Sequence, residues 1–168
     1  MKKILLLFLL SPMLSMAQDS TEATCNLIRQ TDPYTKGKTL STGFINLDGG
    51  SVIIDANSTE IDIMFSISGV DKCYDNNSVA WIFFEGVKTK FTSRNGGTMN
   101  CEGLFHFIYK NTSSANTVLQ KLMTMKTNRI VFTGNNKKET IINIKPGDQE
   151  KFMALLTCLV NEAKTLIK

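Results

Sequence analysis

EIDIMFSI, residues 60–67, decides the fold class of this chain. Its apolar side chains alternate with polar or flexible ones, which is typical of a β-strand with one buried face and one solvated face. Eight more segments rich in β-branched and aromatic residues are predicted as strands: 24–30, 38–46, 51–55, 79–85, 87–92, 101–110, 129–133 and 139–145. The breaks between them carry Gly, Asn, Asp or Pro, and most are too short for parallel crossovers, which indicates antiparallel pairing.

Two helices are expected to interrupt the strands. Residues 114–125 have helical spacing, with Ser114 as the N-cap, and a longer helix follows Pro146 with Asp148 capping its first turn. The second helix presents apolar residues at steps of three and four: Phe152, Leu155, Leu156, Leu159, Ala163 and Leu166. Such a face must cover a sheet, so the sequence predicts an α+β fold with an antiparallel sheet of about 7–9 short strands under this helix. A small β-barrel with an external helix is the alternative.

The N-terminal residues predict export. Two lysines precede the apolar run Ile4–Leu10, and Ser15-Met16-Ala17 forms a small-x-small cleavage site, which together indicate a secretory signal peptide over residues 1–17. The apolar run is too short to span a membrane, which takes about 20 residues. Residues 18–23 are expected to form a disordered leader and residues 24–168 a single globular domain, exported to the periplasm or the extracellular space.

The charge pattern does not indicate a nucleic-acid partner. The chain has a formal net charge of +4, and its lysines are scattered rather than gathered into a basic stripe. The sequence therefore points to a small molecule or a protein as partner. It also predicts no cofactor and no membrane span in the mature chain.

The four cysteines predict two disulfides, because an even number in an oxidising compartment favours pairing. Sequence alone permits three pairings. Cys101 shares a face of its strand with large apolar side chains, so a half-cystine can be buried there. Cys73 follows the strand 60–67. We therefore expect Cys73–Cys101, which leaves Cys25–Cys158 to tie the first strand to the last helix.

DKCYDNNS, residues 71–78, is the most site-like string of the chain. It lacks the ligand spacing of an EF-hand loop, although a calcium site of another kind built from Asp71, Asp75 and Asn77 is a weaker alternative. Its two acids would also raise the pKa of Cys73 and disfavour a reactive thiolate. The string is therefore interpreted as a polar turn in which Asp71, Asp75 and Asn77 bond the backbone of the loop.

His106 is the only imidazole of the chain, and it is interpreted as a structural strand residue. Several acids lie on strand faces or near strand ends, among them Asp55, Glu60 and Asp62, but their spacing does not single out a pair. The sequence thus predicts no catalytic residue and no metal site, and a non-catalytic binding or interaction module. The alternative is a carboxylate-dependent hydrolase with His106 as proton carrier, which a cleft holding His106 within about 3 Å of an acid would favour.

Overall fold

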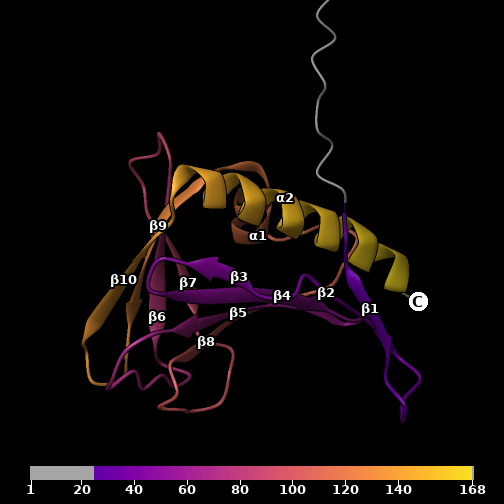
Figure 1. Ribbon diagram of the computed structural model, residues 1–168, viewed down its shortest axis with the longest axis horizontal. Coiled ribbons are helices and arrows are strands. Elements are labelled where there is room, and N and C mark those ends of the chain that lie inside the picture. The colour runs from indigo at the N-terminus through magenta and orange to yellow at the C-terminus, as the bar shows by residue number, and fades with distance from the viewer. Residues whose placement is uncertain (1–24, 168) are drawn as a thin grey trace, which may run out of the picture.

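The computed structural model describes residues 25–167, so the expected signal peptide (1–17) and leader (18–23) lie outside the described residues. Antiparallel strands carry a long C-terminal helix, as the sequence predicts (Figure 1). The strands are β1 (Ile28–Thr31), β2 (Lys38–Ser41), β3 (Ile45–Leu47), β4 (Gly50–Ala56), β5 (Glu60–Ile67), β6 (Val79–Phe84), β7 (Phe91–Arg94), β8 (Leu104–Lys110), β9 (Thr127–Thr133) and β10 (Glu139–Asn143). The helices are α1 (Thr117–Thr124), α2 (Pro146–Ala163) and the 3₁₀ helix η1 (Lys164–Leu166).

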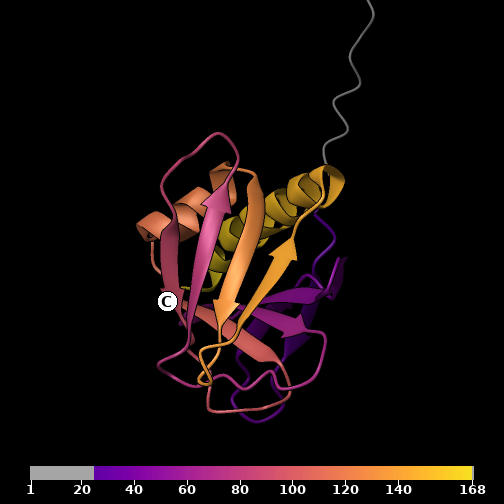
Figure 2. The same ribbon diagram turned by 90° about the vertical axis from the view of Figure 1, so that its left-hand side faces the viewer.

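The strands form two antiparallel sheets. The first has the order β1-β2-β4-β5-β8, with β3 paired to β4, and the second has the order β10-β9-β6-β7. The strands of the second sheet run across those of the first, and no helix lies in front of the second sheet in the view of Figure 2. The two sheets remain separate over residues 25–167, so the alternative of a closed barrel is wrong.

The described chain has ten strands, slightly more than the seven to nine expected. The difference arises in residues 38–46, which the sequence predicts as one strand and the structure divides into β2 and β3. Gly43 lies between them with a φ of 66°, a left-handed conformation that glycine adopts without a steric penalty. After this turn the chain continues as β3, which pairs with β4 as β2 does.

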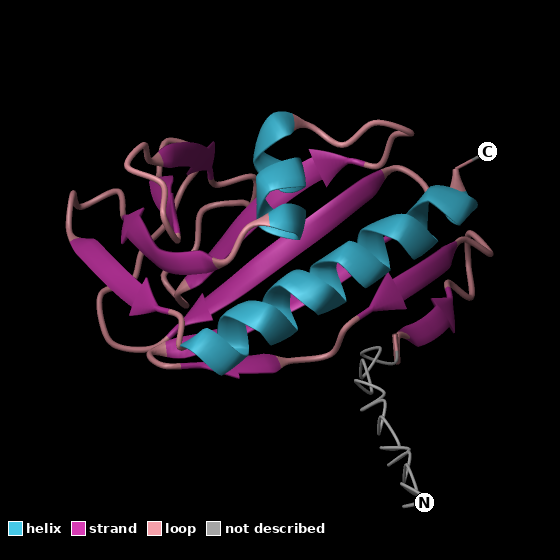
Figure 3. Ribbon diagram, turned by 90° about the horizontal axis from the view of Figure 1, so that it is seen from above, coloured by secondary structure: helices cyan, strands magenta, loops and turns pink. Residues whose placement is uncertain are grey.

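Helix α2 lies along one face of the first sheet (Figure 3). It contacts β4, β9 and β2, and it buries its apolar residues Phe152, Leu156, Leu159, Val160 and Ala163. Its N-cap is Lys145 rather than Asp148, which lies in the first turn, where a negative charge favours the helix dipole. Helix α1 is capped by Asn116 rather than Ser114, because Asn116 Oδ1 accepts a hydrogen bond from Leu119 N at 2.8 Å. No helix of residues 25–167 is long and apolar enough to cross a membrane.

The core between the two sheets and α2 is aromatic. The rings of Phe65, Phe105, Phe107 and Phe132 pack with centroids 5.1–6.3 Å apart. Tyr74 joins them from the connection between β5 and β6, with its ring 5.2 Å from that of Phe105. Offset and edge-on aromatic pairs of this kind contribute about 0.5–1.5 kcal/mol each beyond their burial.

Two disulfides fasten this core. Cys25–Cys158 joins the segment before β1 to α2, and Cys73–Cys101 joins the β5–β6 connection to the β7–β8 connection. This is the pairing that the sequence predicts. Beside the second bond, Tyr74 and Asn100 exchange backbone hydrogen bonds of 2.8 and 2.9 Å. The disulfide and this short bridge together fix two loops against each other.

Candidate functional site

The face of the first sheet that points away from α2 carries a groove. Along β4, alternation sends Val52 and Ile54 under the helix and Asp55 to the opposite face. The strand register then aligns one residue from each of four strands across that outer face: Ile28, Ser41, Asp55 and Asp62. This row crosses β1, β2, β4 and β5, and it forms the middle of the groove.

The groove has a volume of about 530 Å³. This lies within the range of about 300–1,000 Å³ that is usual for small-molecule sites. Its side chains divide into apolar (Ile28, Phe44, Ile53), neutral polar (Gln30, Thr39, Ser41) and acidic (Asp55, Glu60, Asp62) groups, and Leu40, Gly43, Ala56 and Asn57 complete the lining. Among the described residues that line the groove, none is Lys, Arg or His. The groove therefore combines apolar surface with negative charge.

The turn between β4 and β5 determines which carboxylates meet. Asn57 Oδ1 accepts hydrogen bonds from Thr59 N at 2.7 Å, Thr59 Oγ1 at 2.8 Å and Glu60 N at 2.9 Å. The turn sets a register in which Asp55 lies directly opposite Asp62. Two like charges at directly opposed positions repel each other and destabilise a strand pair. The opposition of Asp55 and Asp62 therefore destabilises the folded state.

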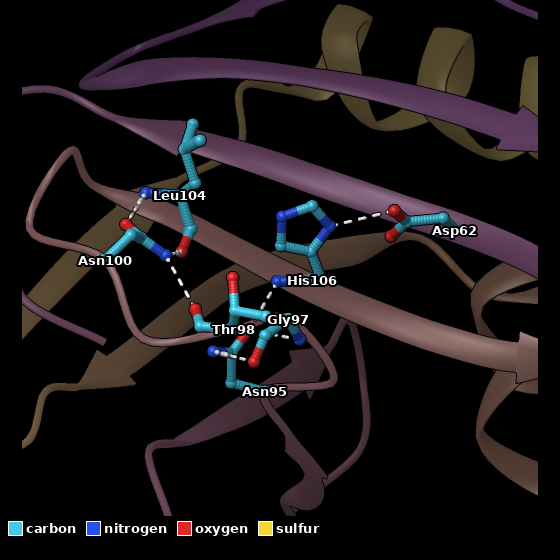
Figure 4. Close-up of polar contacts among 7 residues, drawn as sticks. All are labelled: Asp62, Asn95, Gly97, Thr98, Asn100, Leu104 and His106. Carbon is cyan, nitrogen blue, oxygen red and sulfur yellow. Dashed lines mark hydrogen bonds and ion pairs between the residues drawn. The ribbon is translucent and has the colours of Figure 1, made fainter. Parts of the chain in front are cut away.

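His106 lies next to the groove on β8. Its Nδ1 is 2.8 Å from Asp62 Oδ2, diagonally across the strand pair (Figure 4). Both side chains are largely shielded, with exposed fractions of 21% for His106 and 26% for Asp62. The hydrogen bond to Asp62 is the main reason that the pKa of His106 is raised above its ordinary value, and desolvation opposes this shift. The structure thus brings His106 to an acid that also lines the groove.

The loop between β7 and β8 covers the ring of His106. A Cβ atom on Gly97 would lie 2.5 Å from His106 Cδ2 and 3.3 Å from Nε2, so this approach requires glycine. Asn95 Oδ1 holds the loop by accepting hydrogen bonds from His106 N at 2.8 Å and Gly97 N at 3.3 Å. Asn100 binds both main-chain groups of Leu104, at 2.9 and 3.0 Å (Figure 4). Two asparagines therefore keep the loop against the histidine.

The residues of the loop 71–78 do not gather around a common point. Asp75 Oδ1 accepts hydrogen bonds from Asn77 N and Ser78 N, both at 2.9 Å, and so closes the polar turn. Asp71 turns instead toward Lys138, with Oδ2 and Nζ 3.5 Å apart. The structure brings Asp75 and Asn77 together in the turn but directs Asp71 to another part of the chain. Over residues 25–167, no three His, Cys, Asp or Glu side chains are placed to hold a metal ion.

The chain matches no family model, no curated protein and no solved structure. A functional assignment therefore depends on the geometry of the groove and its surroundings.

Sequence reasoning named Asp55, Glu60 and Asp62 as strand acids without singling out a pair, and it did not predict the groove. The residues that it missed are Ile28, Phe44 and the outward polar residues of β2, whose neighbours in space come from strands distant in sequence. One local signal was present for the acids. Asp55 and Asp62 are equally far from the centre of the Asn57–Glu60 turn, so a hairpin closed by this turn pairs them.

Proposed function

We propose that this protein is an exported, disulfide-stabilised binding module that takes a small molecule in the groove of its first sheet and does not catalyse a reaction. The observation that carries the proposal is the groove of about 530 Å³, with both apolar and polar lining, on the face of the first sheet that points away from α2. Binding sites commonly combine an apolar surface with a few polar groups that orient the ligand. The two disulfides and the apolar N-terminal sequence support export.

The experiment is an NMR screen of the oxidised protein against aromatic and alkyl fragments with cationic, neutral or anionic head groups. We expect at least one fragment to shift the amide signals of the groove strands β1, β2, β4 and β5. The variant Ile53→Trp, which fills the groove, should abolish these shifts. The matched control is Ile141→Trp, a half-exposed outward position of β10 in the other sheet. Shifts confined to other surfaces, or shifts that persist in Ile53→Trp, would refute the proposal.

A carboxylate-dependent hydrolase is a second candidate, favoured by the 2.8 Å contact between His106 and Asp62. Against it, His106 is not among the groove-lining residues, and Gly97 lies against the ring edge that carries Nε2. A panel of nitrophenyl esters and glycosides separates the two candidates. If the protein only binds its ligand, any turnover should be the same in His106→Gln as in the unchanged protein. Turnover that His106→Gln abolishes would establish the hydrolase.

A further inference from the structure

The groove gathers three carboxylates, those of Asp55, Glu60 and Asp62, on the outer face of the first sheet. Four acids elsewhere, Asp48, Asp71, Glu150 and Glu162, each lie within 4.0 Å of a Lys or Arg nitrogen. In the described part of the chain, no Lys or Arg makes such a pair with Asp55, Glu60 or Asp62. The nearest cation by register is Lys110, opposite Glu60. The groove thus gathers three carboxylates whose one ion-pair partner within 4.0 Å, among the described residues, is the imidazole of His106 at Asp62.

One oxygen of Asp62 is also without a hydrogen-bond partner. His106 Nδ1 engages Oδ2, while Oδ1 is inaccessible to solvent and has no partner among the described residues. A buried acceptor without a hydrogen-bond partner destabilises the folded state. Together with the direct opposition of Asp55 and Asp62, it makes the empty groove electrostatically unfavourable. A positive charge placed in the groove would offset the repulsion between the two carboxylates.

The rest of the lining indicates that this positive charge belongs to an organic molecule. Phe44 is 66% exposed, and Ile28 is 49% exposed, so both present apolar surface to an occupant. A metal ion is bound by polar atoms and gains nothing from apolar surface. The described side chains also do not form a three-ligand metal cluster. An aromatic ring such as that of Phe44 additionally attracts an ammonium group placed over its face.

We propose that the groove selects organic cations, namely ammonium compounds with an apolar body whose charged end lies at Asp55 and Asp62. This inference rests on the proposed binding function and names the class of ligand. The carboxylates supply the charge recognition, and Ile28, Phe44 and Ile53 hold the apolar body.

Three probes of nearly equal size test this selectivity: 2-phenylethylammonium, 2-phenylethanol and 3-phenylpropanoate. NMR titration should show the ammonium compound binding in the groove at least about tenfold more tightly than the alcohol, because two or three nearby carboxylates each add a favourable interaction. The propanoate should bind more weakly still. Added sodium chloride should weaken only the binding of the ammonium compound.

The variant Asp55→Asn removes one charge and leaves the His106 contact intact, so it should weaken binding of the ammonium probe several-fold and leave the alcohol unchanged. Glu139→Gln, an exposed acid of β10 outside the groove, is the matched control and should change neither.

The outcomes separate the two proposals. Equal binding of ammonium and alcohol in the groove would overturn the charge selectivity and leave the binding function standing. Groove shifts by calcium chloride that compete with the ammonium probe would replace the organic cation by a metal. Absence of binding by all three probes would overturn the selectivity if other fragments of the screen occupy the groove, and would overturn both proposals if none does.

Discussion

The contact between His106 and Asp62 couples folding to the protonation of one side chain. Because Asp62 raises the pKa of His106 in the folded state, protonated His106 stabilises the fold. This stabilisation is fully present below the unfolded pKa of about 6.5 and is lost as the pH rises through the higher folded value. The chain has a single histidine, so its titration is observed without overlap.

We expect Asp62→Asn to lower the pKa of His106, measured from its imidazole NMR signal. The loss of unfolding free energy caused by this variant should be larger at about pH 5.5 than at about pH 8.5, as measured by urea denaturation. Asp55→Asn is the control, because Asp55 makes no hydrogen bond to His106. An unchanged pKa in Asp62→Asn would contradict this account.

Gly97 is the second residue at which a single atom matters. We expect Gly97→Ala to destabilise the protein by about 1–3 kcal/mol, because the added methyl group would overlap the His106 ring. Gly147→Ala, at a position with no atom within 4 Å of the new Cβ, should cause no loss.

A double-mutant cycle in urea denaturation checks the cause of the Gly97 effect. Replacing His106 by Ala removes the ring, so the cost of Gly97→Ala should become smaller in that background. A cost that is the same with and without the ring would show that the methyl group acts elsewhere.

At the scale of elements, the β4–β5 hairpin determines the pairing of the groove acids. Asn57→Ala removes an acceptor of three hydrogen bonds and should cost about 1 kcal/mol or somewhat more in urea denaturation. Asn57→Asp keeps an oxygen at the same position and should retain most of the stability. If Ala and Asp have the same effect, the side-chain acceptor does not stabilise the turn.

The elements also show how far local sequence patterns reach. β5 spans Glu60–Ile67, the range that its alternation predicts, because one buried and one open face leave only one register for the side chains. The pattern of residues 38–46 predicts one continuous strand, and the backbone reversal at Gly43 is invisible to alternation. The N-caps predicted from the sequence, Ser114 and Asp148, differ from the observed caps of α1 and α2 by two and three residues. Several polar side chains near each helix start can serve as the cap, and the local pattern does not choose between them.

The candidate site was less accessible to sequence reasoning than the fold. The Asp55–Asp62 pair follows from a local hairpin, whereas the contact of Asp62 with His106 needs β8 beside β5, and the groove needs β1 beside β2 and β4. Such strand orders depend on contacts between distant segments, which local periodicity does not encode.

At the scale of the whole molecule, the two disulfides constrain the unfolded chain to different extents. They close loops with sequence separations of 133 residues for Cys25–Cys158 and 28 residues for Cys73–Cys101. The chain-entropy relation gives about 5 kcal/mol for the longer loop and about 3.5 kcal/mol for the shorter one. Replacing the first pair by serine should therefore lower the unfolding free energy more than replacing the second.

Urea denaturation of the two double-serine variants measures this order. The imidazole signal of His106 gives a second readout: it should shift in Cys73→Ser/Cys101→Ser, because that disulfide lies in the loop that covers the ring, and stay in place in the other variant. The reverse order of stability would mean that native-state packing, rather than loop closure, dominates the contribution of these bonds.

Cys25–Cys158 has a mechanical consequence as well. The bond joins the beginning of the described chain to its last long helix, so tension applied to the chain outside these two cysteines passes through sulfur atoms. Both sheets and the groove lie inside this covalent ring and carry none of the load. In single-molecule extension, the reduced protein should extend roughly 450 Å further than the oxidised protein. This length follows from about 3.3–3.6 Å per residue over the separation of 133 residues that the disulfide closes. The groove would keep its shape under a pull that unravels the reduced chain.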